Sequence, residues 1–223
     1  MAKILFVLTS HAVLGDTGKE TGFHFSEAAH VWLPLQAHGY EIDFVSPEGG
    51  KCPIDAFDLD EPLNQKAWQN LHFQEGVKNT LTPEQVKPED YVGIYFVGGH
   101  GAMWDLPDNA RIQELVRAIY ENEGFVAAVC HGSAGLVNVR LSNGKYLVKD
   151  KKINCFTNEE EESVGLTETV PFLLAGKHEE RGAKLEYSDK MQAHVSVNER
   201  ILTGQNPASA TPLAYAILAY LEG

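Results

Sequence analysis

A cysteine and a histidine stand together in AVCHGSAGL, residues 128–136. Cys130 ends a short apolar run, and small residues follow the histidine. A cysteine at a sharp turn between a buried strand and a helix occupies the nucleophile position of an elbow. Free N–H groups at the start of such a helix stabilise a thiolate and can hold an oxyanion. We therefore predict that Cys130 is an exposed nucleophile with a lowered pKa. The alternative is that it is only a small buried hydrophobic residue.

The neighbouring histidines are weaker candidates for chemistry. His131 follows the cysteine directly, but a surface histidine beside a turn is common. Residues 98–101, Gly-Gly-His-Gly, follow a second apolar run. They lack the lysine of a phosphate-binding loop and the spacing of a dinucleotide fingerprint, which favours a tight loop that approaches the site closely. His100 either lines the pocket or only stabilises this loop.

A metal site is a further alternative that the spacing raises. His24, Glu27 and His30 roughly share one face of a predicted helix. A metal would need additional ligands with matching geometry, and the sequence does not offer them. We therefore expect no metal and no other cofactor.

The candidate residues must be positioned by the elements around them, and apolar stretches alternate with helical ones along the chain. Strands that are apolar throughout and separated by helices indicate a parallel sheet covered on both faces. We predict a flavodoxin-like, doubly wound α/β fold with a mostly parallel sheet, whose site lies beyond the carboxyl ends of the strands. The predicted strands lie within 3–10, 40–47, 91–99 and 125–129, and the predicted helices within 24–39, 108–124 and 206–223.

Length and composition limit the classes of protein. The 223 residues are predicted to form one domain, 1–223, with a polar, Pro-rich insertion at about 51–89. The net charge of −13 argues against nucleic acid and anionic membranes as partners. No stretch is long and apolar enough for a membrane span, and the first residues resemble a strand more than a signal peptide. Three widely spaced cysteines are no disulfide framework, which fits a cytoplasmic location.

Several motifs in order carry a resemblance to a known family. AAVCHGSAGL resembles the nucleophile elbow of the ThiJ/PfpI superfamily, which shares its fold with class I glutamine amidotransferases. The other matching stretches are TGFHFSE, FVGGHGAMWDLP, INCFTNEEEE and LTGQNPASA. Together they are similar to the branch that contains the 31-kDa heat-shock chaperones and the glutathione-independent glyoxalases. The resemblance extends from Lys3 to the terminal helix.

The resemblance implies a role for each site residue. Cys130 would be the nucleophile and His131 its neighbouring acid/base. Glu27 would lie close to the sulfur. Because a carboxylate beside a thiolate is a like-charge pair, we expect Glu27 to be the protonated partner when Cys130 is ionised. The backbone N–H groups of Gly99 and His131 would form the oxyanion hole. Counting along INCFTNEEEE, the acid that orients His131 would be Glu161.

Two features depart from the family pattern. Ser133 stands where the family often has proline, which predicts a looser turn. The four-glutamate run 159–162 leaves the orienting acid ambiguous by one position. We expect Glu161 alone to point inward, because adjacent side chains of a helix or turn aim in different directions.

The predicted function is that of a glutathione-independent glyoxalase of the glyoxalase III type. It would convert methylglyoxal or related 2-oxoaldehydes to 2-hydroxy acids through a hemithioacetal on Cys130, as a homodimer. One alternative is a stress-response chaperone or a redox sensor that uses an oxidisable Cys130. Another is a cysteine peptidase or an amidase-type hydrolase. An amidotransferase is disfavoured because the late histidine, His194, has no clear acid partner.

Overall fold

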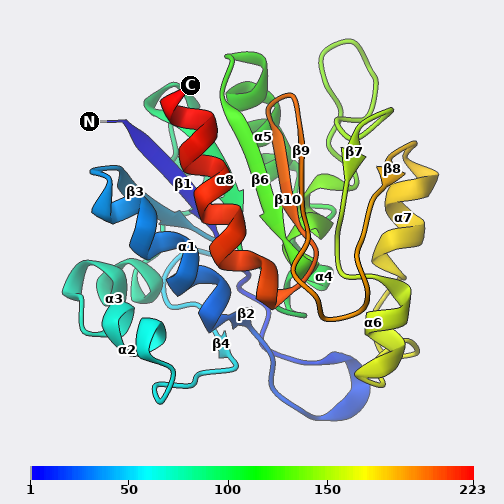
Figure 1. The fold of residues 1–223 in the computed structure, drawn as a ribbon, viewed down its shortest axis with the longest axis horizontal. Helices are drawn as coiled ribbons and strands as arrows, with labels where there is room; N and C mark the ends of the chain where they lie inside the picture. The colour runs from blue at the N-terminus through cyan, green and yellow to red at the C-terminus, as the bar shows by residue number, and fades with distance from the viewer. Residues whose placement is uncertain (1) are drawn as a thin grey trace.

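The central sheet has six strands in the order β3-β1-β5-β6-β10-β9 (Figure 1). In this computed structural model, which describes residues 2–223, neighbouring strands are parallel except for the antiparallel pair of β9 and β10 at one edge. The predicted flavodoxin-like, mostly parallel sheet is confirmed. The strands are β1 (Lys3–Val7), β3 (Glu41–Val45), β5 (Tyr91–Phe96), β6 (Phe125–Val129), β9 (Val195–Asn198) and β10 (Ile201–Gly204).

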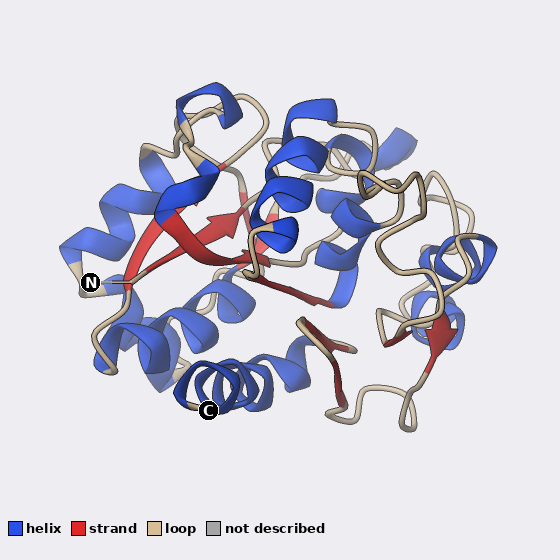
Figure 2. Cartoon of the chain, turned by 90° about the horizontal axis from the view of Figure 1, so that it is seen from above, coloured by secondary structure: helices blue, strands red, loops and turns tan. Residues whose placement is uncertain are grey.

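Helices cover both faces of the sheet, as Figures 1 and 2 show. One face carries α1 (Phe25–Ala37), α3 (Leu71–Lys78) and α8 (Ala210–Glu222), with α2 (Pro62–Trp68) packed beside α1. The other face carries α4 (Ala102–Asp105) and α5 (Ala110–Glu121). Beyond the β10 side lie α6 (Asn158–Ser163) and α7 (Leu174–Glu180), with the short strand pair β7 (Lys152–Ile153) and β8 (Lys184–Leu185).

Single turns of 3₁₀ helix join several of these elements. They are η1 (Gly15–Thr17), η2 (Pro83–Gln85), η3 (Pro88–Asp90) and η5 (Pro207–Ser209). A longer 3₁₀ segment, η4 (Cys130–Leu136), follows β6 directly. The predicted helix after the cysteine is therefore a 3₁₀ helix.

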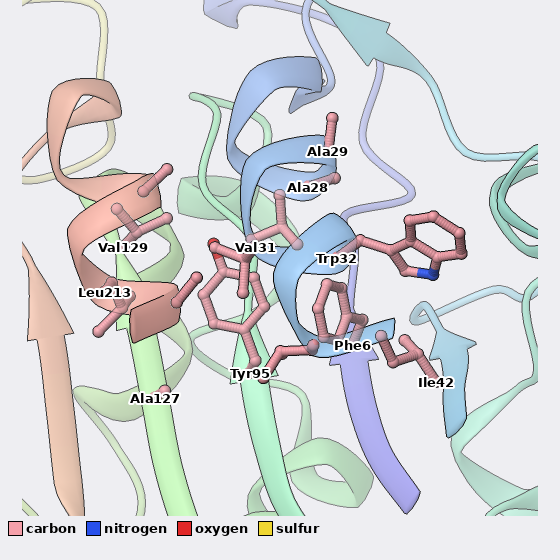
Figure 3. Close-up of a cluster of buried hydrophobic side chains, with 14 of the residues drawn as sticks. Phe6, Ala28, Ala29, Val31, Trp32, Ile42, Tyr95, Ala127, Val129 and Leu213 are labelled. Atoms are coloured by element: carbon pink, nitrogen blue, oxygen red, sulfur yellow. The ribbon is translucent and has the colours of Figure 1, made fainter. Parts of the chain in front are cut away.

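The alternating side chains of β1 explain why every residue from Ile4 to Val7 is apolar. Ile4 and Phe6 point to the layer of α1 and α8, whereas Leu5 and Val7 point to the layer of α5. Figure 3 shows the first layer, where the rings of Phe6 and Tyr95 meet edge to face with centroids 4.8 Å apart. A strand that is buried on both faces has no position for a polar side chain.

Residues 51–89 combine polar turns with two helices. Ala67 of α2 and the residues Phe73 and Val77 of α3 are buried in the same core as β1. Within this segment β4 (Ile54–Asp55) pairs in parallel with β2 (Phe23–His24), which directly precedes α1. The pairing brings Asp55 beside the carboxyl ends of the central strands. The description of residues 51–89 as an insertion within a single domain stays a prediction.

The structure also shows whether a helix could cross a membrane and in what state the cysteines are. Within residues 2–223, no helix is both long enough and apolar enough to cross a bilayer. The three cysteines, Cys52, Cys130 and Cys155, are free and buried. Their thiols are therefore part of the packed interior.

We predict that Gly93→Ala destabilises the protein because β5 has no room for a methyl group there. A Cβ on Gly93 would lie 2.1 Å from the ring of Phe125, and that ring is fully buried and cannot swing away. Urea unfolding should show a loss of about 1–3 kcal/mol, as for overpacked cores. Val92→Ala, at the exposed neighbouring position, is the control and should change stability by less than about 1 kcal/mol. Equal effects of the two changes would contradict the packing argument.

Candidate active site

The cysteine sits at the point where β6 ends and η4 begins. Its φ angle is 54°, in the left-handed region that residues other than glycine rarely adopt. The turn passes so close to β5 that a Cβ on Gly132 would lie 2.5 Å from the carbonyl oxygen of Phe96. This position therefore needs glycine. The hydroxyl of Ser133 donates to the carbonyl of Cys130 over 3.2 Å. Proline could not make that bond, so the departure at this position gives the turn a tether.

Cys130, His131 and Glu161 form a hydrogen-bonded chain. The Sγ atom of Cys130 lies 3.3 Å from Nδ1 of His131, and Nε2 of His131 lies 2.6 Å from Oε2 of Glu161. A carboxylate can only accept, so His131 donates from Nε2 and leaves Nδ1 to accept the thiol proton. Burial lowers the pKa of His131 to about 4. The imidazole is therefore neutral near pH 7 and able to act as a base.

A second histidine joins the same carboxylate. His100 Nε2 lies 2.8 Å from Oε1 of Glu161, and the rings of His100 and His131 have centroids 4.0 Å apart. Burial by itself would raise the pKa of Glu161, but the hydrogen bonds from His100 and His131 outweigh it and lower the pKa to about 2. Glu161 is thus a carboxylate held between two imidazoles. Of the two roles left open for His100, lining the pocket is the one observed.

The expectation that only one glutamate of the run points inward is wrong. Glu160 is fully buried, like Glu161, whereas Glu159 and Glu162 are exposed. The first turn of α6 aims Glu160 at a different set of partners, which lie away from the cysteine. They are the backbone N–H groups of Thr157 and Met191 and the side-chain amides of Gln205 and Asn206. Met191, Gln205 and Asn206 lie on segments that flank β9 and β10, and the spacing of the run could not reveal them as donors.

Glu27 lies on the first turn of α1, against the cysteine. Its side chain is fully buried, and a Cβ on Gly98 would come within 2.2 Å of its Oε2 and 3.0 Å of the Cβ of Cys130. The hydroxyl of Tyr95 donates to its backbone carbonyl over 2.9 Å and fixes the turn. Burial raises the pKa of Glu27 to about 8, although Cys130 and the backbone of Gly98 act in the opposite direction. The carboxyl is therefore neutral near pH 7.

The state of the thiol differs from the prediction. Cys130 is only 3% exposed, because Glu27, His131 and the loop after β5 surround it. Burial and the neighbouring Glu27 raise the pKa of the thiol well above its ordinary value, and the backbone N–H of His131 only partly offsets this. The prediction of an exposed, low-pKa thiol is wrong. The dipole of a short 3₁₀ segment does not compensate for lost hydration.

A small pocket of about 180 Å³ opens over the sulfur. One wall is apolar, and the other carries His24 and Asp55, which are paired across β2 and β4. Sequence reasoning did not place these two residues in the site, because the contact depends on a strand pair of only two residues. A larger hollow of about 420 Å³ beside α7 has no cysteine or histidine among its described lining residues. The apolar wall consists of Phe156, Val164, Met191 and Pro207.

The residues considered for a metal are separated in the structure. His30 pairs with Glu61 at 3.1 Å, whereas Glu27 faces the cysteine. Among the described residues, His100, His131 and Glu161 offer ligand atoms that all lie within 4.8 Å of one another. Both Nε2 atoms already bond to the carboxylate, which accounts for the cluster without an ion. That the site uses no metal stays a prediction.

The fold and the site define a class: a flavodoxin-like α/β protein with a cysteine on a strand-to-helix elbow. Residues 19–220 match the model of the DJ-1/PfpI family. The chain therefore belongs to the DJ-1/PfpI family, in agreement with the resemblance seen in its motifs.

Full-length relatives narrow the comparison. "Glyoxalase 3" of Candida albicans is 32% identical, over 100% of this chain and 99% of the relative. "Glutathione-independent glyoxalase HSP31" of Saccharomyces cerevisiae is also 32% identical, over 93% of each chain. Among solved structures, the Francisella tularensis Rapid Encystment Protein 24 kDa superposes with a TM-score of 0.95 at 39% identity, over 99% of both chains. The crystal structure of Candida albicans glyoxalase III superposes with a TM-score of 0.89 at 29% identity, over 98% of this chain and 96% of that one.

The raised pKa of Glu27 predicts a pH-dependent effect of Glu27→Gln on stability. In the folded protein the pKa is about 8, against an ordinary 4.5. The stability linked to this proton is therefore complete below the ordinary value and is lost as the pH rises through the folded value. Glutamine cannot ionise, so the variant should gain about 2–4 kcal/mol relative to the wild type between about pH 5 and about pH 9.

Urea unfolding of both proteins at the two pH values measures this difference. Glu20→Gln changes an exposed glutamate near the first strand and is the matched control. It should track the wild type across the range. A difference between Glu27→Gln and the wild type that stays constant with pH would show that Glu27 is not a buried neutral acid.

Proposed function

We propose that the protein is a glutathione-independent glyoxalase that converts methylglyoxal or a related 2-oxoaldehyde to a 2-hydroxy acid. The observation that carries the proposal is the chain from Cys130 through His131 to Glu161, with a neutral Glu27 against the same sulfur, beneath a small pocket. Relatives that match over nearly the whole chain and are named glyoxalases support it.

The first step is addition of the thiol to the aldehyde carbon. His131 takes the proton from Sγ as the sulfur attacks, which avoids a free thiolate beside Glu27. The imidazolium that forms is stabilised by the carboxylate of Glu161. The aldehyde oxygen gains charge as its π bond breaks, and the N–H groups of Gly99 and His131 are proposed to hold it. Transfer of the proton to this oxygen completes a hemithioacetal.

The second step moves a proton between adjacent carbons. A base removes the hydrogen from the former aldehyde carbon, the electron pair forms a double bond to the neighbouring carbon, and the ketone oxygen on that neighbour takes up a proton, which gives an enediol. Reprotonation of the neighbouring carbon and loss of the hydroxyl proton on the sulfur-bearing carbon leave a thioester, so one carbon is oxidised and the other is reduced without an external redox partner. Glu27 suits this transfer because a carboxyl whose pKa is about 8 can both give and take a proton near neutral pH. His131 is the alternative base.

The last step is hydrolysis of the thioester. Water adds to its carbonyl carbon, the same oxyanion site holds the developing charge, and the carbon–sulfur bond breaks. The products are the 2-hydroxy acid and the free thiol, which regains its proton. Glutathione is not needed, because the Cys130 thiol itself forms the hemithioacetal.

The other functions predicted from the sequence receive less support. Redox-sensing cysteines are accessible and ionised, whereas burial of Cys130 raises the pKa of its thiol. A peptidase must hold an extended chain, and the pocket of about 180 Å³ admits only a small molecule. Chaperone activity is a separate property, and it stays a prediction, as do the homodimer and the cytoplasmic location.

Incubation of the purified protein with methylglyoxal, without glutathione, should produce lactate. Cys130→Ser should abolish this activity, because a serine hydroxyl is a much weaker nucleophile near neutral pH. Cys155→Ser changes a cysteine that lies outside the pocket lining and should retain turnover. Full lactate production by Cys130→Ser would refute the covalent mechanism.

Glu161→Gln should lower turnover at least about a hundredfold, because an amide does not stabilise the imidazolium as a carboxylate does. The control is Glu162→Gln, the exposed next residue of the same run, which should keep the wild-type rate. The pH profile of kcat should also change in Glu161→Gln, since the charge that supports His131 is gone. Equal rates in the two variants would exclude Glu161 as the partner of His131.

A further inference from the structure

The pocket over Cys130 carries negative charge at its wall and has no matching cation. Asp55 lines it, and among its described lining residues there is neither lysine nor arginine. We propose that Asp55 is a specificity-determining residue that keeps anionic aldehydes out of the pocket and admits neutral ones. The inference rests on the proposed function and narrows its substrate class to uncharged 2-oxoaldehydes.

The position of Asp55 is fixed by the backbone. β4 pairs with β2 so that Asp55 stands opposite His24, the last residue before α1. One carboxylate oxygen accepts the N–H of Ala56 over 2.7 Å, and the other accepts the hydroxyl of Thr21 at 3.4 Å. Ala56 has a φ of 50°, so the chain turns sharply directly after the carboxylate. The charge is therefore held at the pocket wall.

The histidines of the pocket do not neutralise this charge. Burial lowers the pKa of both His24 and His131 to about 4, so both are neutral near pH 7. His100 bonds to Glu161, whose carboxylate matches any positive charge on that ring. An anion entering the pocket would meet the carboxylate of Asp55 at the wall and would lose hydration at the same time.

The charge of Asp55 shifts the pKa values of two neighbouring groups. It raises the pKa of Glu27 and opposes the lowering of the pKa of His24, two groups at the start of α1. The proposed reaction begins with a neutral aldehyde and ends with a carboxylate. The same repulsion that excludes an anionic substrate therefore favours departure of the product.

Alkylation of Cys130 tests this without relying on turnover. Iodoacetamide is neutral and iodoacetate is anionic, and the two have nearly the same size. The rate ratio of the two reagents at Cys130, measured by peptide mapping and divided by the ratio for free cysteine, reports exclusion of the anion. A change in the thiolate fraction affects both reagents equally and cancels from the ratio.

In the wild type we expect iodoacetate to be disfavoured by about tenfold beyond its ratio with free cysteine. Asp55→Asn keeps the acceptor for Ala56 but removes the charge, and should reduce this factor at least about threefold. Asp55→Glu, which keeps the charge, should retain it. Asp60→Asn removes an exposed charge from the same segment and should also retain it. An Asp55→Asn ratio equal to that of the wild type would overturn the proposal.

Salt and product inhibition give two independent checks. In about 1 M salt the Debye length falls to about 3 Å, so the charge of Asp55 is largely screened. The preference of the wild type for iodoacetamide over iodoacetate should then shrink toward that of Asp55→Asn. Lactate should inhibit methylglyoxal turnover by Asp55→Asn at a several-fold lower concentration than for the wild type. Unchanged inhibition would count against the proposal. Absence of methylglyoxal turnover in the wild type would refute the proposed function alone, because the alkylation ratio would still be readable.

Discussion

The site depends on one backbone conformation, the left-handed φ of 54° at Cys130. An L-residue in this region costs about 1–2 kcal/mol, so the surroundings must hold it there. β6 fixes the chain before the turn through its pairing with β5 and β10. After the turn, Gly132 fits against the carbonyl of Phe96, and Ser133 binds the carbonyl of Cys130 while its hydroxyl also contacts the buried ring of His178. The strained conformation of Cys130 is therefore held by contacts of the chain both before and after it.

That conformation brings the Cys130 thiol together with three other ionisable groups, and burial decides how the four share protons. Glu27 and the thiol of Cys130 are both pushed toward their neutral forms. His131 is neutral as well, so Glu161 is the one charged group in the chain of residues that contacts the sulfur and its base. A single buried carboxylate with two imidazole partners is tolerable, whereas a thiolate beside a second carboxylate is not. The site therefore stays uncharged at the sulfur until a substrate accepts the electron pair and His131 accepts the proton.

The sequence predicted much of the fold, because its signal was periodic and apolar. The runs that became β1, β5 and β6 are buried on both faces, and no other element explains a continuous apolar stretch between helices. The elbow at Cys130 was visible for the same reason, since a small-residue cluster followed a buried strand. The position of His131 against Glu161 depended on the resemblance, because nothing in the spacing of the acidic run shows which carboxyl meets an imidazole.

The missed features depend on contacts between distant segments. The two-residue pair of β2 and β4 has no periodicity to detect, so the approach of Asp55 to the pocket was not predicted. The pKa of Cys130 was predicted from the elbow alone, but its value depends on burial by Glu27 and the loop after β5. Local sequence describes the turn, whereas the dielectric around the sulfur is set by segments about thirty and about a hundred positions earlier in the chain.

The two buried glutamates of α6 have different roles: Glu160 holds the helix in place, and Glu161 supports the proposed base. A buried carboxylate is stable only when donors replace its water. Glu160 receives donors from Thr157, Met191, Gln205 and Asn206, which ties the start of α6 to the segments that flank β9 and β10. With the helix held there, the next side chain, Glu161, has one direction left, toward the imidazoles of His100 and His131. The carboxylate that supports the proposed base is thus aimed by the carboxylate beside it.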